Sequence, residues 1–510
     1  MTHTTLSTYR CARALWGRCI CALAFAAART GSPAPAAAVQ YNGPPAKYVF
    51  LFIGDGMGLH QRTAAELYMK TIREKEPGRI SHTAQLAMNQ LPTQGMCTTY
   101  AANSLITESA AAATAIATGR ETKTGIVNMD PSRTIRYKTV TELAKKNGMK
   151  VGIVSSTPIT DATPACFYAH QPNRNKYYEI GYELATSDVD YFGGGGPHHP
   201  RGPKGRRRDV REIAKANGFF IVDTRHAFRR LHRGLGKVWA IHESRGDGES
   251  MPYELDRHPD DVTLAEYTRK GIELLDNPNG FLLVVEGGKI DWACHANDAA
   301  AAIMDTLALD AAVAEASRFM DKHPDETLVI VTADHECGAM SLGFAGVGKA
   351  GTIEKLRHQR MSYSAFDKTL ESFKRRRPGG AAVVRLIEET FGLKVPSNRN
   401  AGKKKKDPMM LTDHQLHALQ TAFKRSMSGE RVRSRDDHMY VLYGGYEPFT
   451  VTLTHTLNQK AGITWGSYGH TASPVPVSAG GIGHELFNGY YHNTDVGLKI
   501  MAVMYLAPAP

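Results

Sequence analysis

Four short, uninterrupted apolar runs constrain the fold of this chain more than any other feature. They lie at Tyr48–Ile53, Val151–Val154, Phe281–Val285 and Leu328–Val331. Continuous runs are typical of strands buried on both faces of a parallel sheet, whereas a half-buried strand alternates apolar and polar residues. Helical patterns separate them, such as the apolar residues spaced three and four apart over Ala299–Met320. This alternation predicts an α/β fold, a three-layer sandwich with a central, mostly parallel sheet flanked by helices.

The composition supports a large folded core and leaves the class of binding partner open. The chain has 510 residues, 42% hydrophobic and 22% charged, enough for one large α/β domain or two ordinary domains. Its formal net charge of +12 suits an anionic substrate, a nucleic acid or a membrane surface. Two basic runs, at 206–211 and 403–406, are interpreted as solvated loops. Because no basic patch is interleaved with aromatic residues, we expect no specific nucleic-acid partner.

Residues 1–38 are predicted to be a signal peptide. Three arginines precede a short apolar stretch at Cys19–Ala28, and the small residues Ala36–Ala38 offer a cleavage site. This interpretation predicts an exported protein, periplasmic or extracellular; the alternative is a mis-assigned start. The apolar stretch is too short for a bilayer-spanning helix, and no other run reaches about 20 residues, so we expect no membrane span.

Residues 39–510 are expected to form one domain with a helical insertion. From about 345 to 460 the sequence has helical patterns but no strand followed by a carboxylate. Gly193–Gly196 is interpreted as a flexible turn after a strand at Val189–Phe192. The domain contains four cysteines, Cys97, Cys166, Cys294 and Cys337. An even number permits two disulfides, but no spacing pairs them, so we predict buried free thiols.

Carboxylates and histidines follow all four apolar runs. They are Asp55 after the first run, Asp161 after the second, Glu286 with Asp291 and His295 after the third, and Asp334 with His335 after the fourth. The carboxyl ends of parallel strands meet at one edge of a sheet, where ligands bind. One such strand end would be unremarkable, but four make a metal site the leading explanation.

Residue spacing supports a metal role for Asp291 and His295. Four residues apart on a helix, they share a face and can reach one ion, and their oxygen and nitrogen donors suit Zn²⁺. A surface ion pair is the alternative interpretation. Near the C-terminus, Trp465–Thr471 places His470 in a glycine-rich turn, where backbone can pack close to a site. Taken alone, His470 would be assigned a structural role.

Ser109 is the candidate nucleophile. It begins a stretch of alanine and threonine that continues to Thr118, just before Gly119, and that predicts a helix of small residues. At a helix N-terminus, free N–H groups and the helix dipole favour a serine alkoxide and also bind phosphate. An ordinary N-cap serine fits the local sequence equally well.

Six segments together resemble the alkaline phosphatase family in order and spacing. They are Gly54–Gly58, the Ser109 segment, Asp161–Ala165, Glu286 with Asp291 and His295, Thr332–His335 and Gly469–Thr471. The similarity extends from about residue 47 to 345 and resumes from about 465 to 505. Each motif is modest by itself, but six in order make coincidence an inadequate explanation. The resemblance implies a metal-dependent phosphomonoesterase whose catalytic domain is residues 39–510.

The resemblance also implies roles for individual residues, with two Zn²⁺ and one Mg²⁺ per subunit. The implied ligand sets are Asp291, His295 and His470 for one zinc, Asp55, Asp334 and His335 for the other, and Asp55, Thr163 and Glu286, with Asp161 contributing, for magnesium. Ser109 would attack a phosphate monoester to form a phosphoserine, which water hydrolyses to inorganic phosphate. Arg174 would bind two phosphate oxygens. Relatives are often dimers, so a homodimer is allowed.

Two positions depart from the family pattern. Glu108 precedes the nucleophile, where aspartate is usual and helps to orient the arginine; the extra methylene could displace Arg174 or be absorbed by the backbone. Trp292 follows Asp291, where some relatives carry lysine or histidine. These differences put catalytic efficiency in doubt rather than the class of reaction.

Three other functions compete with a phosphomonoesterase. A phosphodiester has one fewer free phosphoryl oxygen, so Arg174 and a full third metal site argue against a diesterase. A sulfatase uses an oxidised cysteine or serine in a local motif that is absent around Ser109. A non-catalytic metal- or phosphate-binding protein would not require the complete set of nucleophile and ligands.

Overall fold

The computed structural model describes residues 39–73, 81, 83–347, 352–376, 379–396, 407–429 and 438–507. The predicted signal peptide at 1–38 and the basic run at 403–406 lie outside these residues. Of the described helices, none combines the length and apolar character needed to cross a bilayer.

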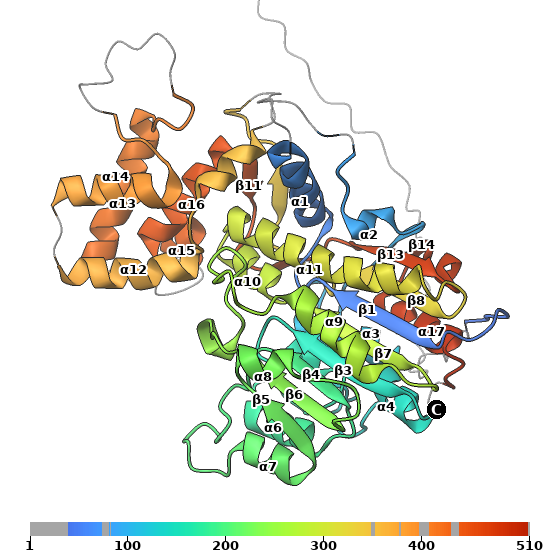
Figure 1. Cartoon of the computed structure of the whole chain (residues 1–510). Coiled ribbons are helices and arrows are strands. Elements are labelled where there is room, and N and C mark those ends of the chain that lie inside the picture. Colours follow the sequence, from blue (N-terminus) through green and yellow to red (C-terminus); the bar gives the residue numbers. More distant parts are fainter. Residues whose placement is uncertain are drawn as a thin grey trace, which may run out of the picture. The chain divides into compact units, whose positions relative to one another are not determined.

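A ten-stranded sheet lies at the centre of the fold (Figure 1). Its strands are β1 (Tyr48–Ile53), β2 (Thr93–Cys97), β3 (Lys150–Ser155), β4 (Tyr191–Gly194), β5 (Phe219–Val222), β6 (Lys237–Ile241), β7 (Phe281–Glu286), β8 (Thr327–Thr332), β13 (Val475–Gly481) and β14 (Gly489–Tyr491). Their spatial order is β14-β2-β13-β8-β1-β7-β3-β4-β6-β5. Only β13 pairs antiparallel to its neighbours in this sheet, so the mostly parallel sheet predicted from the sequence is confirmed.

The four apolar runs form adjacent strands at the middle of this sheet. β1 pairs in parallel with β7 on one side and with β8 on the other, and β3 pairs with β7. Every residue of β1, β7 and β8 is buried, which explains why these segments are apolar without alternation. In register, Ile53 of β1 lies beside Glu286 and Thr332, so the three strands end together.

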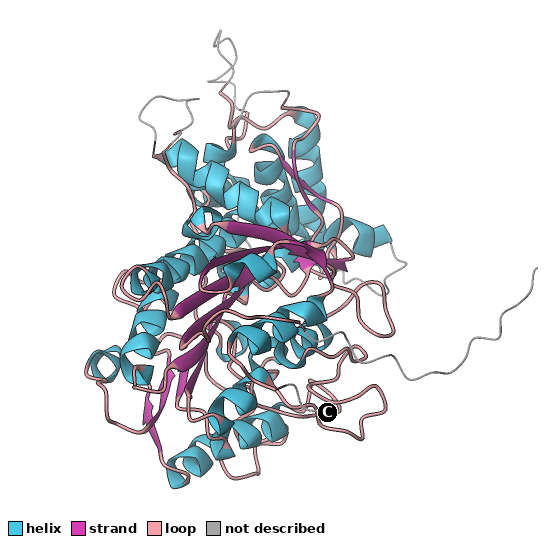
Figure 2. Ribbon diagram, turned by 90° about the vertical axis from the view of Figure 1, so that its right-hand side faces the viewer, coloured by secondary structure: helices cyan, strands magenta, loops and turns pink. Residues whose placement is uncertain are grey.

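Helices flank the sheet on both faces (Figure 2). They are α1 (Leu59–Ile72), α2 (Ala87–Gln90), α3 (Ser109–Thr118), α4 (Val140–Lys146), α5 (Ala162–Ala165), α6 (Tyr177–Thr186), α7 (Val210–Ala216), α8 (Arg225–Arg229), α9 (Leu264–Leu275), α10 (Lys289–His295), α11 (Ala299–Met320) and α17 (Asn493–Val503). α11 packs on α1 and α9, while α3 packs on α4 and α17. The helix predicted over Ala299–Met320 has those bounds.

Between β10 (Met340–Leu342) and β11 (Ile463–Trp465) the described chain is helical. The elements are the 3₁₀ helix η2 (Ile353–His358) and helices α12 (Tyr363–Arg375), α13 (Gly380–Phe391), α14 (Asp413–Ser428), α15 (His438–Tyr443) and α16 (Pro448–Lys460). β10 and β11 pair antiparallel, so the two ends of this segment meet. A second small sheet pairs β9 (Glu336–Cys337) with β12 (His470–Thr471). Two other 3₁₀ helices are η1 (Asp247–Glu249) and η4 (His484–Phe487).

Two local expectations from the sequence are wrong. Gly193 and Gly194 belong to β4 and are buried, whereas a flexible turn was expected there. A Cβ on Gly194 would lie 1.9 Å from the carbonyl oxygen of Ser155, so glycine is needed for close packing against β3. His470 lies on β12, opposite Cys337, and not in a turn, because pairing with a distant segment imposes an extended backbone.

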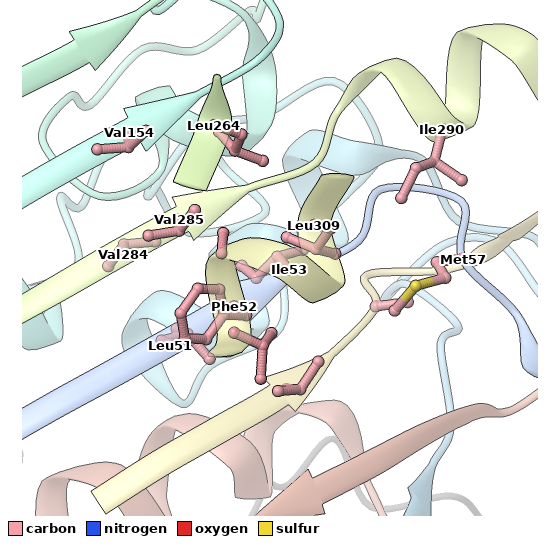
Figure 3. Close-up of a cluster of buried hydrophobic side chains, with 14 of the residues drawn as sticks. Leu51, Phe52, Ile53, Met57, Val154, Leu264, Val284, Val285, Ile290 and Leu309 are labelled. Atoms are coloured by element: carbon pink, nitrogen blue, oxygen red, sulfur yellow. The ribbon is translucent and has the colours of Figure 1, made fainter. Parts of the chain in front are cut away.

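A continuous apolar core lies beneath the carboxyl ends of the central strands. Figure 3 shows Phe52 and Ile53 of β1 with Val285 of β7 and Leu309 of α11 in this core. Met57, in the loop after β1, is also fully buried and labelled there. The strand ends are therefore held by packing, and the polar loops that follow them start from fixed positions.

Candidate active site

The central strands deliver four oxygen-bearing side chains to one edge of the sheet. Asp55 lies two residues after β1, Asp334 lies two residues after β8, and Glu286 is the last residue of β7. Thr163 lies in α5, which follows β3. All four side chains are buried.

The first group of candidate metal ligands consists of Asp291, His295 and His470. Asp291 Oδ2 lies 3.3 Å from His295 Nε2, and Asp291 Oδ1 lies 3.6 Å from His470 Nε2. The two Nε2 atoms are 3.1 Å apart. The short helix α10 places Asp291 and His295 on one face, and β12 supplies His470 from the far end of the chain.

Backbone carbonyls orient both histidines of this group. His295 Nδ1 donates to the carbonyl oxygen of Tyr468 at 2.7 Å, and His470 Nδ1 donates to that of Thr107 at 3.0 Å. With the proton on Nδ1, each Nε2 presents its lone pair to the centre of the group. Thr107 and Tyr468 were not predicted from the sequence. They act through main-chain carbonyl groups, which every residue has, so their side chains do not reveal the role.

The second group surrounds His335 Nε2. Asp334 Oδ2 lies 3.3 Å from this nitrogen, Asp55 Oδ1 lies 3.4 Å from it, and Ser109 Oγ also lies 3.4 Å from it. The His335 ring stacks on that of His470 at a centroid distance of 3.7 Å, so the two groups are neighbours. The structure thus brings together residues from 55 to 470 around one serine hydroxyl.

The third group is built from oxygen atoms. Thr163 Oγ1 lies 3.4 Å from Asp55 Oδ2 and 3.5 Å from Asp334 Oδ2. Glu286 Oε2 accepts hydrogen bonds from Ser155 and Thr157, whereas its buried Oε1 has no partner among the described residues. Thr157 is a contributor to which the sequence analysis gave no role.

Asp161 sits apart from the direct contacts of the third group. Its Oδ1 accepts from the backbone N–H of Ala162 at 2.8 Å and from Nη2 of Arg174 at 3.1 Å. Its negative charge nevertheless raises the pKa values of Asp55 and Glu286. In this structure Asp161 is therefore placed beside the third group, where it contacts the guanidinium.

Ser109 is the first residue of α3, and Glu108 is its N-cap. The Glu108 carboxylate accepts from the backbone N–H groups of Ala110 and Ala111 at 3.0 and 2.8 Å, and from that of Gly125 at 2.7 Å. The ordinary serine N-cap considered from the sequence is therefore not the role of Ser109. Glu108 Oε2 also accepts from Arg174 Nη1 at 2.6 Å, so the N-cap joins the serine to the arginine.

The buried carboxylates strongly perturb one another. Burial and the charges of neighbouring acids raise the pKa of Asp55, and the same causes raise the pKa of Asp334 to about 7 and that of Glu286 to about 8. Burial and the charge of His470 lower the pKa of His335. Such a concentration of negative charge needs cations to stay ionised at neutral pH.

The described cysteines are free and buried, which confirms the prediction of thiols. Cys337 lies with Asp291, His295 and His470 in one cluster of possible donor atoms. Burial raises the pKa of Cys337 well above its usual value, so it remains a neutral thiol there.

Comparison with known proteins gives matches over nearly the whole chain. The family model described as alkaline phosphatase matches residues 46–506. Alkaline phosphatase 4 of Bacillus subtilis is 28% identical over 493 residues, which cover 94% of this chain and 93% of that protein. Streptomycin-6-phosphate phosphatase of Streptomyces griseus is 33% identical over 356 residues, covering 60% of this chain and 77% of that protein.

Solved structures agree with these sequence matches. The cold-active alkaline phosphatase of Shewanella sp. has a TM-score of 0.71 and 25% identity, covering 90% of this chain and 99% of that one. The Thermus thermophilus alkaline phosphatase has a TM-score of 0.72 and 25% identity, covering 91% and 92%.

The fold and the site define a phosphatase that acts on phosphate monoesters. Its cluster of carboxylates, imidazoles and a serine lies at the carboxyl edge of the sheet, where an α/β fold binds ligands. More particularly, the chain belongs to the alkaline phosphatase family.

Proposed function

We propose that this phosphatase holds two Zn²⁺ and one Mg²⁺ and works through a phosphoserine on Ser109. One observation carries the zinc part of the proposal. An ion about 2.0 Å from tetrahedrally arranged donors has donor–donor distances of about 3.3 Å. The distances within the first group are 3.1, 3.3 and 3.6 Å, and those around His335 Nε2 are 3.3, 3.4 and 3.4 Å. Both groups have the dimensions of a zinc site.

Unpartnered buried oxygens support the same assignment. Asp55 Oδ1, Asp291 Oδ1 and Glu286 Oε1 are buried and have no hydrogen-bond partner within the described part of the chain. A buried carboxylate oxygen without a partner costs several kcal/mol unless a cation binds it, roughly the penalty of desolvating an ion. Asp55, Thr163 and Glu286 offer only oxygen, which suits Mg²⁺, with Asp161 at the edge of that site.

The chain's own residues position a phosphate monoester for in-line attack. When bound, the two zinc ions would stabilise negative charge on the attacking and departing oxygens. Ser109 Oγ loses its proton to solvent and attacks phosphorus as the bond to the ester oxygen breaks. The phosphoryl group becomes attached to Ser109, and the departing oxygen takes up a proton from water and leaves as the alcohol. Water then cleaves this phosphoserine, which releases inorganic phosphate and restores the serine hydroxyl.

Arg174 has the geometry to bind two phosphate oxygens. Glu108 and Asp161 each accept from a different Nη atom, so every Nη keeps a second hydrogen for phosphate. The two carboxylates also fix the plane of the guanidinium, which would otherwise rotate. The distance of 2.6 Å between Glu108 Oε2 and Arg174 Nη1 supports the same orienting role for Glu108 as for the aspartate that is usual at this position.

Metal analysis and a serine variant test the proposal. Purified protein should contain two zinc equivalents, chelation should abolish hydrolysis of an aryl phosphate, and zinc with magnesium should restore it. Ser109→Ala should keep the zinc but lose at least about 1,000-fold in kcat, as expected when a nucleophile is removed. Brief reaction of the wild type followed by acid quenching should yield a peptide phosphorylated on Ser109. Full activity in Ser109→Ala would refute the role of the serine.

A diester substrate tests the competing reaction class. Arg174 and the third group of ligands favour a dianionic phosphoryl group, so a bis-aryl phosphodiester should be a far poorer substrate than the matched aryl monoester. A preference for the diester would contradict the proposed site. Export and a homodimer remain part of the proposal, to be checked by N-terminal sequencing of the mature protein and by its mass in solution.

A further inference from the structure

Asn297 is a hydrogen-bond hub directly behind the first group of ligands. It follows α10 by two residues, is 1% exposed and has a φ of 52°, a left-handed conformation that asparagine tolerates. Its side-chain amide donates to the carbonyl oxygens of Cys294 at 2.8 Å and Ser467 at 2.9 Å. The first carbonyl belongs to the helix that carries Asp291 and His295. The second belongs to the segment that leads into His470.

The helical segment between β10 and β11 is attached to the same residue. His455 of α16 lies with Nε2 3.0 Å from Asn297 Oδ1, and Asn458 of α16 donates to the main-chain oxygen of Asn297 at 2.8 Å. Because both amide hydrogens of Asn297 point to carbonyls, Oδ1 must accept and His455 Nε2 must carry the proton. Burial keeps the His455 ring neutral, since it lowers the pKa to about 4.

The next residue repeats this attachment at the other end of the helical segment. Asp298 accepts from Gln359 Nε2 at 2.8 and 2.9 Å, and from the backbone N–H of Tyr363 at 2.8 Å. The His455 ring also stacks on Tyr468, whose carbonyl orients His295. Two consecutive residues therefore bind both ends of the helical segment to the turn that directly follows α10, the helix that carries two candidate metal ligands.

We infer that Asn297 and His455 are positioning residues through which the helical segment sets the metal affinity of the Asp291, His295 and His470 group. The inference rests on the proposed zinc site. The three ligands come from two segments about 175 residues apart, and Asn297 ties these segments at Cys294 and Ser467. Groups that orient ligands from behind commonly change metal affinity by about 10–100-fold when removed.

Metal retention by the full-length protein tests this inference. Asn297→Gly removes the side-chain bonds while allowing the positive φ. His455→Ala removes the contact with Asn297 Oδ1 together with the stacking on Tyr468, and it leaves the hydrogen bond from Asn458 in place. His455→Gln keeps an N–H donor and serves as the conservative rescue. Thr450→Ala is the matched control, because Thr450 is buried on the same helix and contacts Asp367 rather than Asn297.

The readouts are the rate of zinc transfer to a colorimetric chelator and the visible absorption of the Co²⁺-substituted protein. Asn297→Gly and His455→Ala should release one zinc equivalent at least tenfold faster than the wild type and shift the cobalt bands. In these two variants the second zinc equivalent should be released at the wild-type rate. His455→Gln and Thr450→Ala should release both equivalents at the wild-type rate and keep the wild-type cobalt bands. If Asn297→Gly does not fold, the comparison of His455→Ala with His455→Gln decides.

Two outcomes overturn the inference and differ in what else they affect. Zinc release at the wild-type rate in Asn297→Gly or His455→Ala overturns the inference alone. A wild-type protein that takes up no zinc overturns the proposed function as well.

Discussion

Glu108 illustrates how a single residue serves the site in several ways. Its carboxylate caps α3, accepts from Gly125 and holds Arg174 at 2.6 Å. Burial opposes its ionisation, but the charge of Arg174 and three backbone N–H donors outweigh burial and lower its pKa. The longer side chain therefore still reaches the guanidinium, one of the two outcomes left open by the sequence.

Glu108→Gln should weaken phosphate binding. Loss of the charge opposite Arg174 leaves the guanidinium less firmly oriented, so the inhibition constant of inorganic phosphate should rise by about tenfold, roughly 1.4 kcal/mol. Steady-state inhibition of aryl phosphate hydrolysis measures it. Glu179→Gln, which neutralises an exposed partner of Arg207, is the control. An unchanged inhibition constant would show that Arg174 does not depend on Glu108.

His170 should make stability depend on pH on the alkaline side. It is buried, and burial lowers its pKa. The carboxylates of Glu142 and Glu183, 3.4 and 3.8 Å from its ring nitrogens, outweigh burial and raise the pKa to about 9. Since the unfolded value is about 6.5, the charged ring stabilises the fold fully below pH 6.5, and this contribution is lost as pH rises through 9. The loss is about 3 kcal/mol. Urea unfolding between pH 6 and 10 should show this slope in the wild type, and His170→Gln should flatten it.

At the scale of elements, small residues let α3 and α17 approach closely. All ten residues of α3 are buried, and α3 contains only alanine, threonine, serine and one isoleucine. A Cβ on Gly497 of α17 would lie 2.4 Å from the carbonyl oxygen of Ile116. Since α3 begins with Ser109, this contact helps to fix the position of the Ser109 side chain above the sheet.

Gly497→Ala should therefore destabilise the protein, although alanine normally stabilises a helix interior by about 1 kcal/mol relative to glycine. The clash with backbone must move α3 or α17, so we expect a loss of about 1–3 kcal/mol, typical of overpacking, together with lower kcat. Thermal unfolding and aryl phosphate hydrolysis measure the two effects. Gly380→Ala at the start of α13, where a Cβ has no neighbour within 4 Å, should be neutral or stabilising. A more stable Gly497→Ala would contradict the packing argument.

Considered as a whole, the molecule joins distant parts of the chain at the proposed metal site. Its candidate ligands lie between Asp55 and His470, and the contacts of Asn297 and Asp298 add the helical segment to the same network. Folding must close long loops before these groups meet, and cations bound at the proposed site would offset the repulsion among the buried carboxylates.

Removal of the ions should lower stability in a pH-dependent manner. An ion whose free concentration is 100 times its Kd raises the free energy of unfolding by about 2.7 kcal/mol. EDTA should therefore markedly lower Tm, and added zinc and magnesium should restore it. In the metal-free protein the pKa of Asp334 is raised to about 7 and that of Glu286 to about 8. Because the same carboxyls titrate near pH 4 in the unfolded chain, the metal-free protein should lose stability as pH rises from about 4 to about 8, with little further loss above pH 8. Calorimetry with and without EDTA checks both effects; an unchanged Tm after verified metal loss would contradict them.

Local sequence patterns are sufficient to locate the central strands and the polar groups that follow them. The runs at Tyr48–Ile53 and Phe281–Val285 coincide with β1 and β7 to within a residue, and Ala299–Met320 coincides with α11. Burial on both faces demands apolar residues at every position of a strand, so this signal is local and readable. The order of the six motifs likewise indicates the family without reference to the fold.

The tertiary structure determines how these segments meet. It placed β1 between β7 and β8, drew Gly193 and Gly194 into β4, and brought His470 to His295 through pairing of β12 with β9. It also assigned the carbonyls of Thr107 and Tyr468 to the two histidines. Such contacts depend on strand pairing and close packing between residues far apart in the sequence. Because main-chain groups are the same in every residue, no local sequence pattern predicts which carbonyl groups will contact the two histidines.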